Sequence, residues 1–235
     1  MPIAAPDAPA VPVFEHASAP VAVDAYASIG SQYVYRGIAL RDHTTVSAAV
    51  SASASGWFVD GWAGLVDTET HTQMQYTYST SHGTEWNIDA SIGYGAPIGN
   101  NWQWSFAGAR VFDVGEGNHP SEDYAEWRAN LFFRDAMRAQ IAYSPNYLQR
   151  GSSLWNVEIA TQYPLTDVLS GQVGGGYSHG GDINDYNYGY GWIGLAGVLL
   201  QTQWDIRWID TSGAYDPDRA GSRVVVTLSW GQHLR

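Results

Sequence analysis

Apolar and polar residues alternate from about Val21 to the end of the chain, and this alternation constrains the fold more than any other feature. In the segment WNIDASIGY (residues 86–94), the even positions are Trp, Ile, Ala, Ile and Tyr, whereas the odd positions are Asn, Asp, Ser and Gly. Successive side chains of a β-strand point to opposite faces, so this segment would have one apolar and one polar face. The same alternation recurs in residues 127–133, 137–144, 155–163, 204–209 and 223–230. We therefore expect an all-β chain whose two faces contact different solvents.

The connections between these segments alternate in length. Short connections fall at residues 55–56, 97–101, 135–136 and 164–167. Long polar connections fall at residues 39–43, 67–84, 114–122, 146–153, 179–187 and 212–221. Short periplasmic turns and long extracellular loops are typical of outer-membrane barrels, which have an even number of strands. We predict a transmembrane antiparallel β-barrel of about 12 strands, with ten as the alternative because the boundary in VLLQTQ (198–203) contains no turn-forming residue.

The residue types on the two faces distinguish a membrane barrel from a soluble one. A soluble β-sandwich or lipocalin-like barrel would fill its interior with interlocking Leu, Ile and Val. Here the apolar face carries Trp and Tyr near strand ends with Ala and Gly between them, and the opposite face carries acids and arginines. This pattern favours an aromatic girdle in lipid around a polar lumen. We assign to the girdle Tyr33, Tyr35, Trp86, Tyr94, Trp127, Trp155, Trp204, Trp208 and Trp230.

The composition excludes several classes of protein. All 11 basic residues are arginine, and 23 acidic residues give a formal net charge of -12, so nucleic acid is not expected as a partner. There is no cysteine, which excludes disulfides and thiolate metal sites. The longest apolar stretch, WIGLAGVLL (192–200), has about half the residues that a transmembrane helix needs.

Residues 1–21 differ from the rest of the chain. They contain repeated Ala-Pro units and lack the basic region and apolar core of a signal peptide. We therefore expect an Ala/Pro-rich periplasmic segment at residues 1–21 and an outer-membrane β-barrel at residues 22–235. The predicted location is the outer membrane of a Gram-negative bacterium, with any signal peptide already removed from this sequence.

Five short blocks resemble those of a known family. They are YVYRGI (33–38), SGWFVDGWAGLVD (55–67), AYSPNY (142–147), YPL (163–165) and the closing WIDT…SRVVVTLSW (208–230). In this order they are similar to blocks of the TorF family of porins, formerly a proteobacterial family of conserved hypothetical proteins. The resemblance implies an outer-membrane barrel with a pore role, and it implies no substrate or catalytic residue. The chain departs from the family pattern at Tyr35, where the family has Phe, and it continues past Trp230.

The polar face supplies the charged side chains expected to line the lumen. Strand parity assigns to it Asp24, Arg36, Asp89, Glu126, Arg128, Arg138, Glu158, Asp205, Arg207 and Arg223. Arginines facing acids across a narrow lumen would create a transverse field and a charge filter for small solutes. Alternatively, they would form cross-strand ion pairs that fill a barrel too small to conduct, because twelve strands lie between the filled eight-strand and the open sixteen-strand cases.

Histidines in the predicted external loops are weak candidates for metal ligands. They are His43, His71, His82, His119 and His179, each near carboxylates in the sequence. Imidazole with carboxylate suits zinc or copper, and clustered acids alone suit calcium. No two histidines have a close ligand spacing such as His-x-His, so solvated loop histidines without a metal are the favoured expectation. No cofactor is expected.

An enzyme is not expected. Twelve-stranded lipid hydrolases need Ser, His and Asn or Asp on outward-facing strand positions, and no histidine lies within a predicted strand. The sequence therefore predicts a porin for passive diffusion of small polar solutes or ions. The alternative is a non-conducting barrel that acts as a structural or loop-mediated interaction module. The expected partners are outer-membrane lipid, lipopolysaccharide and small solutes, with a monomer as the default because a closed barrel has no free edge.

Overall fold

The computed structural model describes residues 21–74, 77–114, 123–134, 136–149, 151–180, 187–214 and 219–234, and gives the backbone alone for residues 68–74, 77–82 and 233–234. The elements are β1 (Ala22–Gly30), β2 (Tyr33–Tyr35), β3 (Ile38–Arg41), β4 (Thr45–Ala54), β5 (Trp57–Met74), β6 (Thr77–Ile98), β7 (Trp102–Val114), β8 (Tyr124–Phe133), β9 (Met137–Ser144), the 3-10 turn η1 (Tyr147–Gln149), β10 (Leu154–Pro164), β11 (Leu169–His179), β12 (Tyr188–Leu199), β13 (Thr202–Ser212) and β14 (Arg223–Leu234). Across these ranges no helix is long and apolar enough to cross a membrane. Apart from Val21, the predicted N-terminal segment lies outside the described residues.

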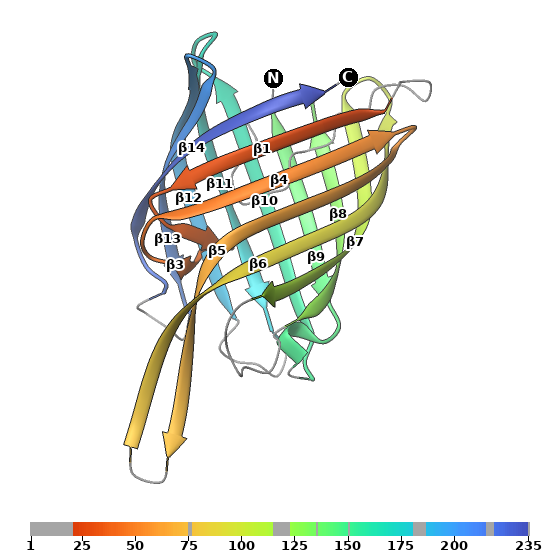
Figure 1. Ribbon diagram of the computed structural model, residues 1–235. Helices are drawn as coiled ribbons and strands as arrows, with labels where there is room; N and C mark the ends of the chain where they lie inside the picture. The colour runs from red at the N-terminus through yellow and green to blue at the C-terminus, as the bar shows by residue number, and fades with distance from the viewer. Residues whose placement is uncertain are drawn as a thin grey trace.

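Twelve of the described strands close into one antiparallel barrel (Figure 1). Its order is β1-β14-β13-β12-β11-β10-β9-β8-β7-β6-β5-β4, and β4 pairs back onto β1. The closing ladder between β1 and β14 runs from Val23 opposite Leu234 to Gly30 opposite Thr227. Closure pairs both edges of every wall strand, which satisfies backbone groups that lipid cannot hydrogen-bond. The prediction of a twelve-stranded transmembrane barrel is confirmed, and the ten-strand alternative is wrong.

The two ends of the barrel differ as the connection lengths predict. The tight turns, the start of β1 and the end of β14 share one end, and the long connections share the other (Figure 1). The long polar connection predicted at residues 67–84 lies at this end, and much of it is strand, because β5 and β6 stay paired from Asp67 opposite Thr84 to Met74 opposite Thr77. The paired strands project beyond the barrel as an arm (Figure 1). The predicted loops at 114–122 and 179–187 lie largely outside the described residues, as do residues 215–218 of the predicted loop at 212–221.

The alternation of residue types separates the two faces of the wall. On β8, Trp127 is exposed on the outer face, whereas Glu126 and Arg128 are buried on the inner face. Val157 and Ile193, on other strands, expose 52% and 59% of their surface on the outside. So much exposed apolar surface along the strands is what contact with lipid requires.

The connection between β1 and β4 departs from the prediction. The segment YVYRG was expected to continue the first wall strand, but β1 ends at Gly30, and β2 pairs with β3 in a separate two-stranded sheet. Arg36 and Gly37 form the turn between them, with φ angles of 50° and 81°. Positive φ at both central residues is typical of a tight hairpin turn, where Asn-Gly or Asp-Gly is the usual sequence. Because an arginine holds the first position, the usual signal for a turn is missing.

The turn between β12 and β13 is the boundary that the sequence left unmarked. Leu200 and Gln201 adopt φ angles of 49° and 70°, and Leu200 is almost fully exposed. A left-handed backbone at a residue with a Cβ costs roughly 1 kcal/mol or more. The pairing of β12 with β13 therefore imposes a conformation that these two residues disfavour by themselves.

Replacing Leu200 with Asn and Gln201 with Gly is expected to raise the free energy of unfolding by about 1–2 kcal/mol, because both new residues tolerate positive φ. The measurement is urea unfolding in lipid vesicles. A double alanine variant at the same positions keeps the unfavourable backbone and serves as the control. Equal stability of the Asn-Gly and double alanine variants would show that the turn is not under this constraint.

Candidate functional site

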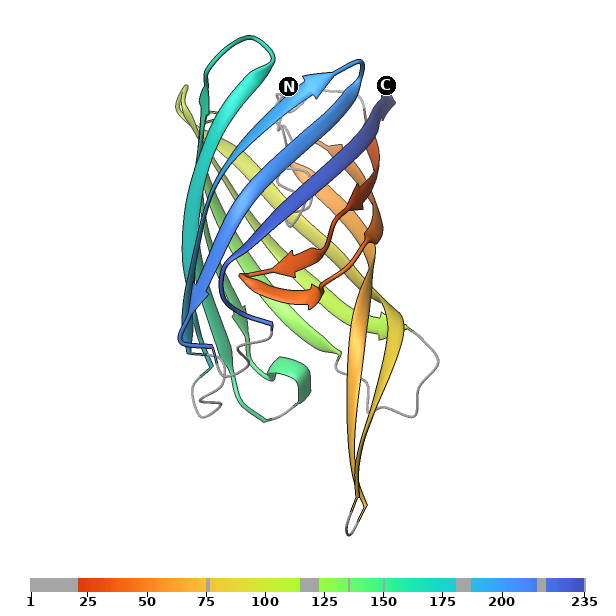
Figure 2. The same cartoon turned by 90° about the vertical axis from the view of Figure 1, so that its left-hand side faces the viewer.

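The β2–β3 hairpin lies inside the ring of wall strands, where strands from opposite sides of the barrel contact it (Figure 2). Thr211 of β13 donates a hydrogen bond from Oγ1 to the carbonyl oxygen of Gly37, at 2.7 Å. On the other side, the ring of Tyr33 stacks on Trp62 of β5 with a centroid distance of 5.0 Å. A Cβ atom at Gly37 would lie 2.5 Å from Cβ of Tyr190 on β12, so only glycine permits this approach. The hairpin is thus fitted against the inner wall.

An apolar cluster inside the lumen forms the seat of the hairpin. Val34 and Ala39 supply the hairpin side, and they are 2% and 4% exposed. The wall supplies Tyr188, Tyr190, Trp192, Ile209 and Val225. Burial of these side chains stabilises the hairpin in the lumen through the hydrophobic effect.

Glycines of β11 make room for the aromatic residues of this seat. A Cβ atom at Gly174 would lie 2.2 Å from the ring of Trp192, and one at Gly176 would lie 2.5 Å from the hydroxyl of Tyr190. The rings of Tyr190 and Trp192 are nearly parallel, with an interplanar angle of 12°. These inward aromatic residues were not predicted from the alternation of apolar and polar residues. The signal for them was the alternation YGYGW (188–192) on one strand and GGG (174–176) on its neighbour.

The tip of the hairpin is held by buried charges. Arg36 binds Glu126 of β8 through two parallel contacts, Nη1 to Oε2 at 2.8 Å and Nη2 to Oε1 at 2.9 Å. Arg128 donates from Nε to the same carboxylate at 2.7 Å and also pairs with Asp89 of β6. Glu126 is 1% exposed. The charges of these two arginines and two carboxylates therefore neutralise one another. Glu126 of the wall is the acidic partner of Arg36.

Two further ion pairs involve wall residues that the sequence assigned to the lumen. Arg138 of β9 pairs with Glu158 of β10, and the hydroxyl of Tyr190 donates to Glu158 at 2.9 Å. Arg207 donates from Nε to Asp205, two residues earlier on β13, at 2.8 Å. These four residues lie on the inner face of the wall, at positions where strand parity places polar side chains.

The remaining predicted lumen residues lie nearer the rims. Arg223, at the start of β14, donates to the carbonyl oxygen of Ala220 at 2.7 Å and contacts Gln32 at 3.4 Å. It lies opposite Ile209 of β13, two residues beyond the position that faces Arg207. Asp24 lies on β1 beside Ser51 of β4, near the end of the barrel that carries the tight turns.

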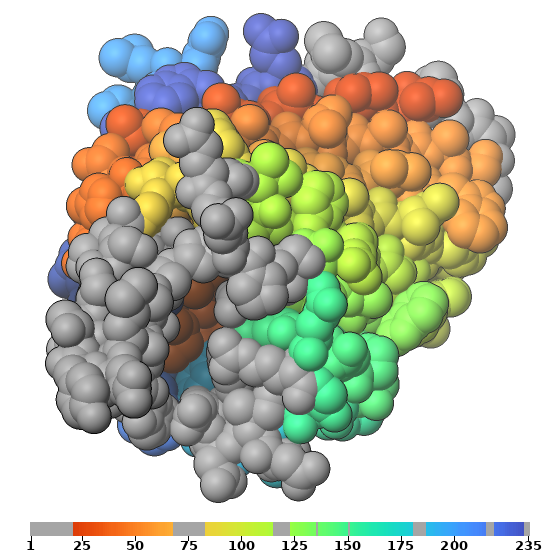
Figure 3. Space-filling model, turned by 60° about the horizontal axis from the view of Figure 1, so that its bottom comes forward, coloured from red at the N-terminus to blue at the C-terminus, as the bar shows by residue number. Residues whose placement is uncertain are grey.

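A cavity of about 50 Å³ lies between the hairpin and the charged wall. It is lined by Tyr35 and Arg36 of the hairpin and by Asp89, Arg128, Arg138, Glu158, Trp192 and Arg207 of the wall, among others. A volume of this size holds a few water molecules. Figure 3 turns the end with the long connections toward the viewer, and this end is hollowed, with atoms in the red-brown of the hairpin deep in the hollow. The hairpin thus occupies part of the lumen.

The aromatic residues assigned to the girdle divide into two groups. The expectation that Tyr33 and Tyr35 face lipid is wrong, because both lie on the hairpin inside the barrel, Tyr33 against Trp62 and Tyr35 against Arg36. The others lie on the outer faces of wall strands. Toward the long connections are Trp86, Trp127, Trp155 and Trp208, and toward the tight turns are Tyr94, Trp204 and Trp230. This arrangement places aromatic side chains at two levels of the outer surface, as an interfacial girdle requires.

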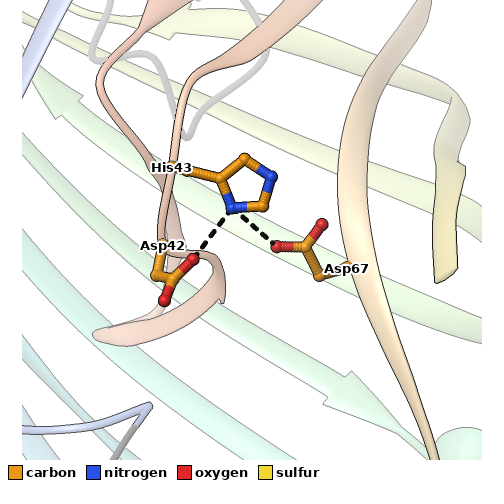
Figure 4. A group of neighbouring side chains, drawn as sticks. All are labelled: Asp42, His43 and Asp67. Carbon is orange, nitrogen blue, oxygen red and sulfur yellow. Dashed lines mark hydrogen bonds and ion pairs between the residues drawn. The ribbon is translucent and has the colours of Figure 1, made fainter. Parts of the chain in front are cut away.

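One of the candidate histidines, His43, lies within 4 Å of two carboxylates. Nδ1 of His43 lies 2.9 Å from Oδ1 of Asp42 and 3.4 Å from Oδ2 of Asp67 (Figure 4). The hydrogen bond with His43 lowers the pKa of Asp42 below its ordinary value. His179 was expected in a loop but is the last residue of β11, on its exposed outer face. The side chains of His71 and His82, and all of His119, lie outside the described residues.

A serine motif on β11 does not form a nucleophile site. Residues 176–180 read Gly-Tyr-Ser-His-Gly, which matches the Gly-x-Ser-x-Gly pattern of hydrolases, but that chemistry needs a sharp strand-to-helix turn. Here Ser178 lies within a strand, fully buried on the inner face, and accepts a hydrogen bond from Asn156 at 2.9 Å. The neighbouring His179 points to the opposite face, so it has no access to the serine hydroxyl.

Replacing Glu126 with Gln is expected to lower the free energy of unfolding by about 3 kcal/mol or more, because Arg36 and Arg128 then remain buried without their shared counter-charge. The matched control is Asp123→Asn, which breaks the exposed contact of Asp123 with Arg110 at 3.3 Å. That change is expected to cost less than about 1 kcal/mol, as for other exposed ion pairs. Equal losses of unfolding free energy in the two variants, measured by urea unfolding, would show that Glu126 does not anchor the hairpin.

Neither a protein-family model nor a curated protein sequence matches the chain, so the TorF resemblance stays a prediction. Among solved structures, the fold is similar to KdgM porin, with 9% sequence identity over 89% of this chain and 98% of that chain and a TM-score of 0.50. It is also similar to an outer-membrane channel from Pseudomonas putida F1, with 10% identity over 99% of this chain and 100% of that chain and a TM-score of 0.52. The chain therefore has the fold of outer-membrane porins and channels.

Proposed function

We propose that the chain is an outer-membrane channel for small polar solutes or ions, and that the β2–β3 hairpin forms its constriction. The observation that carries this proposal is the position of Arg36, which Glu126 holds inside the lumen beside a water-sized cavity with charged walls. Rings of charged side chains at a narrow point are the usual basis of solute selection in channels. The outer aromatic residues would then contact outer-membrane lipid, with the chain as a monomer.

The two sides of the lumen suit different tasks. Most of the large charged and aromatic side chains described above belong to β8–β13, where the hairpin is seated, although Trp62 and Asp89 lie on β5 and β6. The facing strands β1 and β4 carry small hydroxyl side chains, such as Ser28 and Ser47, whose Oγ atoms lie 2.6 Å apart. Asp24 and Tyr26 lie on the same inner face of β1, further from the long connections. Small polar side chains leave the lumen wider and present hydrogen-bonding groups to a hydrated solute. We infer that solutes pass along this side, opposite the charged wall.

Catalysis is not part of the proposal. Ser178 is buried and His179 faces outward, and arginines hold the inner acids Asp89, Glu126, Glu158 and Asp205. A carboxylate held by a guanidinium is stabilised in its charged form, which makes it a weak proton donor. The geometry suits passive passage rather than acid-base chemistry.

A second candidate function is a non-conducting barrel that presents its external connections to partners. The specific observation that favours it is the small size of the cavity, together with the mutual neutralisation of Arg36, Glu126, Arg128 and Asp89. In that case the charges stabilise a filled lumen and select nothing. Removal of the hairpin distinguishes the two functions, because the wall does not depend on it.

The hairpin can be removed without breaking the wall, because Gly30 of β1 pairs directly with Thr45 of β4. Replacing residues 31–44 with a tight Asn-Gly turn therefore joins two neighbouring strands. We expect the single-channel conductance in planar bilayers to rise several-fold, since the constriction is lost. If the native chain is a channel, the unaltered protein also gives conductance steps. Steps from the shortened protein alone would favour the filled barrel, and steps from neither would overturn the channel proposal.

The control for this deletion shortens the β5–β6 arm, which projects beyond the barrel (Figure 1). Removing residues 70–81 is expected to leave the conductance unchanged. A second variant, Gly37→Ala, adds one carbon atom at the tip of the hairpin. The new Cβ would clash with Tyr190 and Thr211. It is expected to displace the turn and to raise the conductance in the same direction as the deletion.

Replacing Arg138 with Gln is expected to shift the reversal potential in a salt gradient toward cation selectivity. The change removes a positive charge from the cavity wall and leaves Glu158, which keeps its hydrogen bond from Tyr190. The control is Arg110→Gln, whose side chain is on the outer surface and half exposed. A reversal potential that does not change, or that changes equally in both variants, would remove Arg138 from the filter.

A further inference from the structure

We propose that Asp42, His43 and Asp67 form a binding site for a divalent transition-metal ion, with zinc as the best fit. The proposal does not depend on conduction through the lumen. Asp42 and His43 lie in the connection between β3 and β4, at the base of the hairpin, and Asp67 lies on wall strand β5 (Figure 4). The ligand atoms of the three side chains all lie within 4.8 Å of one another. The sequence gives no such spacing, because Asp67 is brought to His43 by the fold.

The separation of His43 and Asp67 matches that of two ligands in a tetrahedral metal site. Ligands about 2.1 Å from zinc at tetrahedral angles lie about 3.4 Å from one another. Nδ1 of His43 lies 3.4 Å from Oδ2 of Asp67 and 2.9 Å from Oδ1 of Asp42. The Asp42 side chain is 83% exposed, so it is free to adjust to an ion. The cluster thus needs little movement to bind metal.

Asp67 is held in the orientation that such a site needs. Arg41 donates from Nη1 to Oδ1 of Asp67 at 2.6 Å and to Oγ1 of Thr84 at 3.2 Å. This contact occupies one carboxylate oxygen and leaves Oδ2 directed at His43 (Figure 4). Outer hydrogen bonds that fix a ligand in this way are a regular feature of metal sites. They reduce the loss of side-chain freedom on binding.

The donor set selects the class of metal. One imidazole and two carboxylates favour zinc and related transition metals, whereas calcium takes six to eight oxygen ligands. The imidazole would bind through Nδ1 and keep its proton on Nε2, which is compatible with a neutral ring. Because His43 is 58% exposed, water would complete the coordination. A bound ion would also tie the base of the hairpin to the wall at β5.

The test is calorimetric titration of the full chain, in detergent and freed of metal by chelator, with zinc chloride. We expect His43→Ala to lose one bound zinc per chain or at least tenfold in affinity, and Asp42→Asn to weaken binding in the same direction. Asp42→Asn keeps the result interpretable if the alanine variant folds poorly, because its side chain is almost fully exposed. The matched control is His179→Ala, an exposed histidine outside the cluster, which is expected to leave the titration unchanged.

A second measurement reports the ligands directly. Cobalt in place of zinc is expected to give the visible absorption of a tetrahedral site, and this band should disappear in His43→Ala and persist in His179→Ala. Zinc is also expected to raise the midpoint of thermal unfolding of the native chain and not of His43→Ala, since only the folded state assembles the site. Titrations of the native chain and His43→Ala that coincide would overturn the proposal, as would the absence of zinc binding to the native chain.

Discussion

Completion of the backbone hydrogen-bond ladder in lipid is the constraint on which the rest of this structure depends. A backbone amide or carbonyl left unpaired in hydrocarbon costs several kcal/mol, so a sheet in a membrane must close on itself. Here β1 pairs with β14 on one side and with β4 on the other, which leaves the wall without an edge. Closure divides the side chains between lipid and an enclosed polar space. It also imposes tight turns, as at Leu200 and Gln201, whatever the preference of the residues there.

The enclosed space has to be filled or lined, and this chain fills part of it with an inserted hairpin. Gly30 and Thr45 are paired neighbours, so the residues between them are not needed for the wall. They carry both an apolar face, through Val34 and Ala39, and a charge at the tip, Arg36. The apolar face packs on the aromatic residues of β12. The charge is stable inside only because Glu126 binds it through two contacts in an interior where an unpaired charge is costly.

Prediction from the sequence succeeded where a pattern repeats and failed where a single local event decides the path of the chain. Period-two alternation predicted the barrel, because parity along a strand is a local property. The turn at Arg36 and Gly37 was missed because its first residue is not one that marks a turn. For the same reason the boundary at Leu200 was left open. The inward direction of Tyr190 and Trp192 was missed because aromatic residues on a barrel were expected to contact lipid.

The sequence by itself determined that the strands have one apolar and one polar face, and therefore that the chain forms a closed barrel with its wall charges inside. Only the tertiary structure decided which charges meet. Arg36 and Glu126 are 90 residues apart in the chain, and Asp67 reaches His43 only because β5 passes the base of the hairpin. The physical reason is that alternation sets the face on which a side chain lies, whereas its partner depends on strand register, on the width of the barrel and on the path of the inserted hairpin. None of these three properties produces a periodic pattern of residues in the sequence.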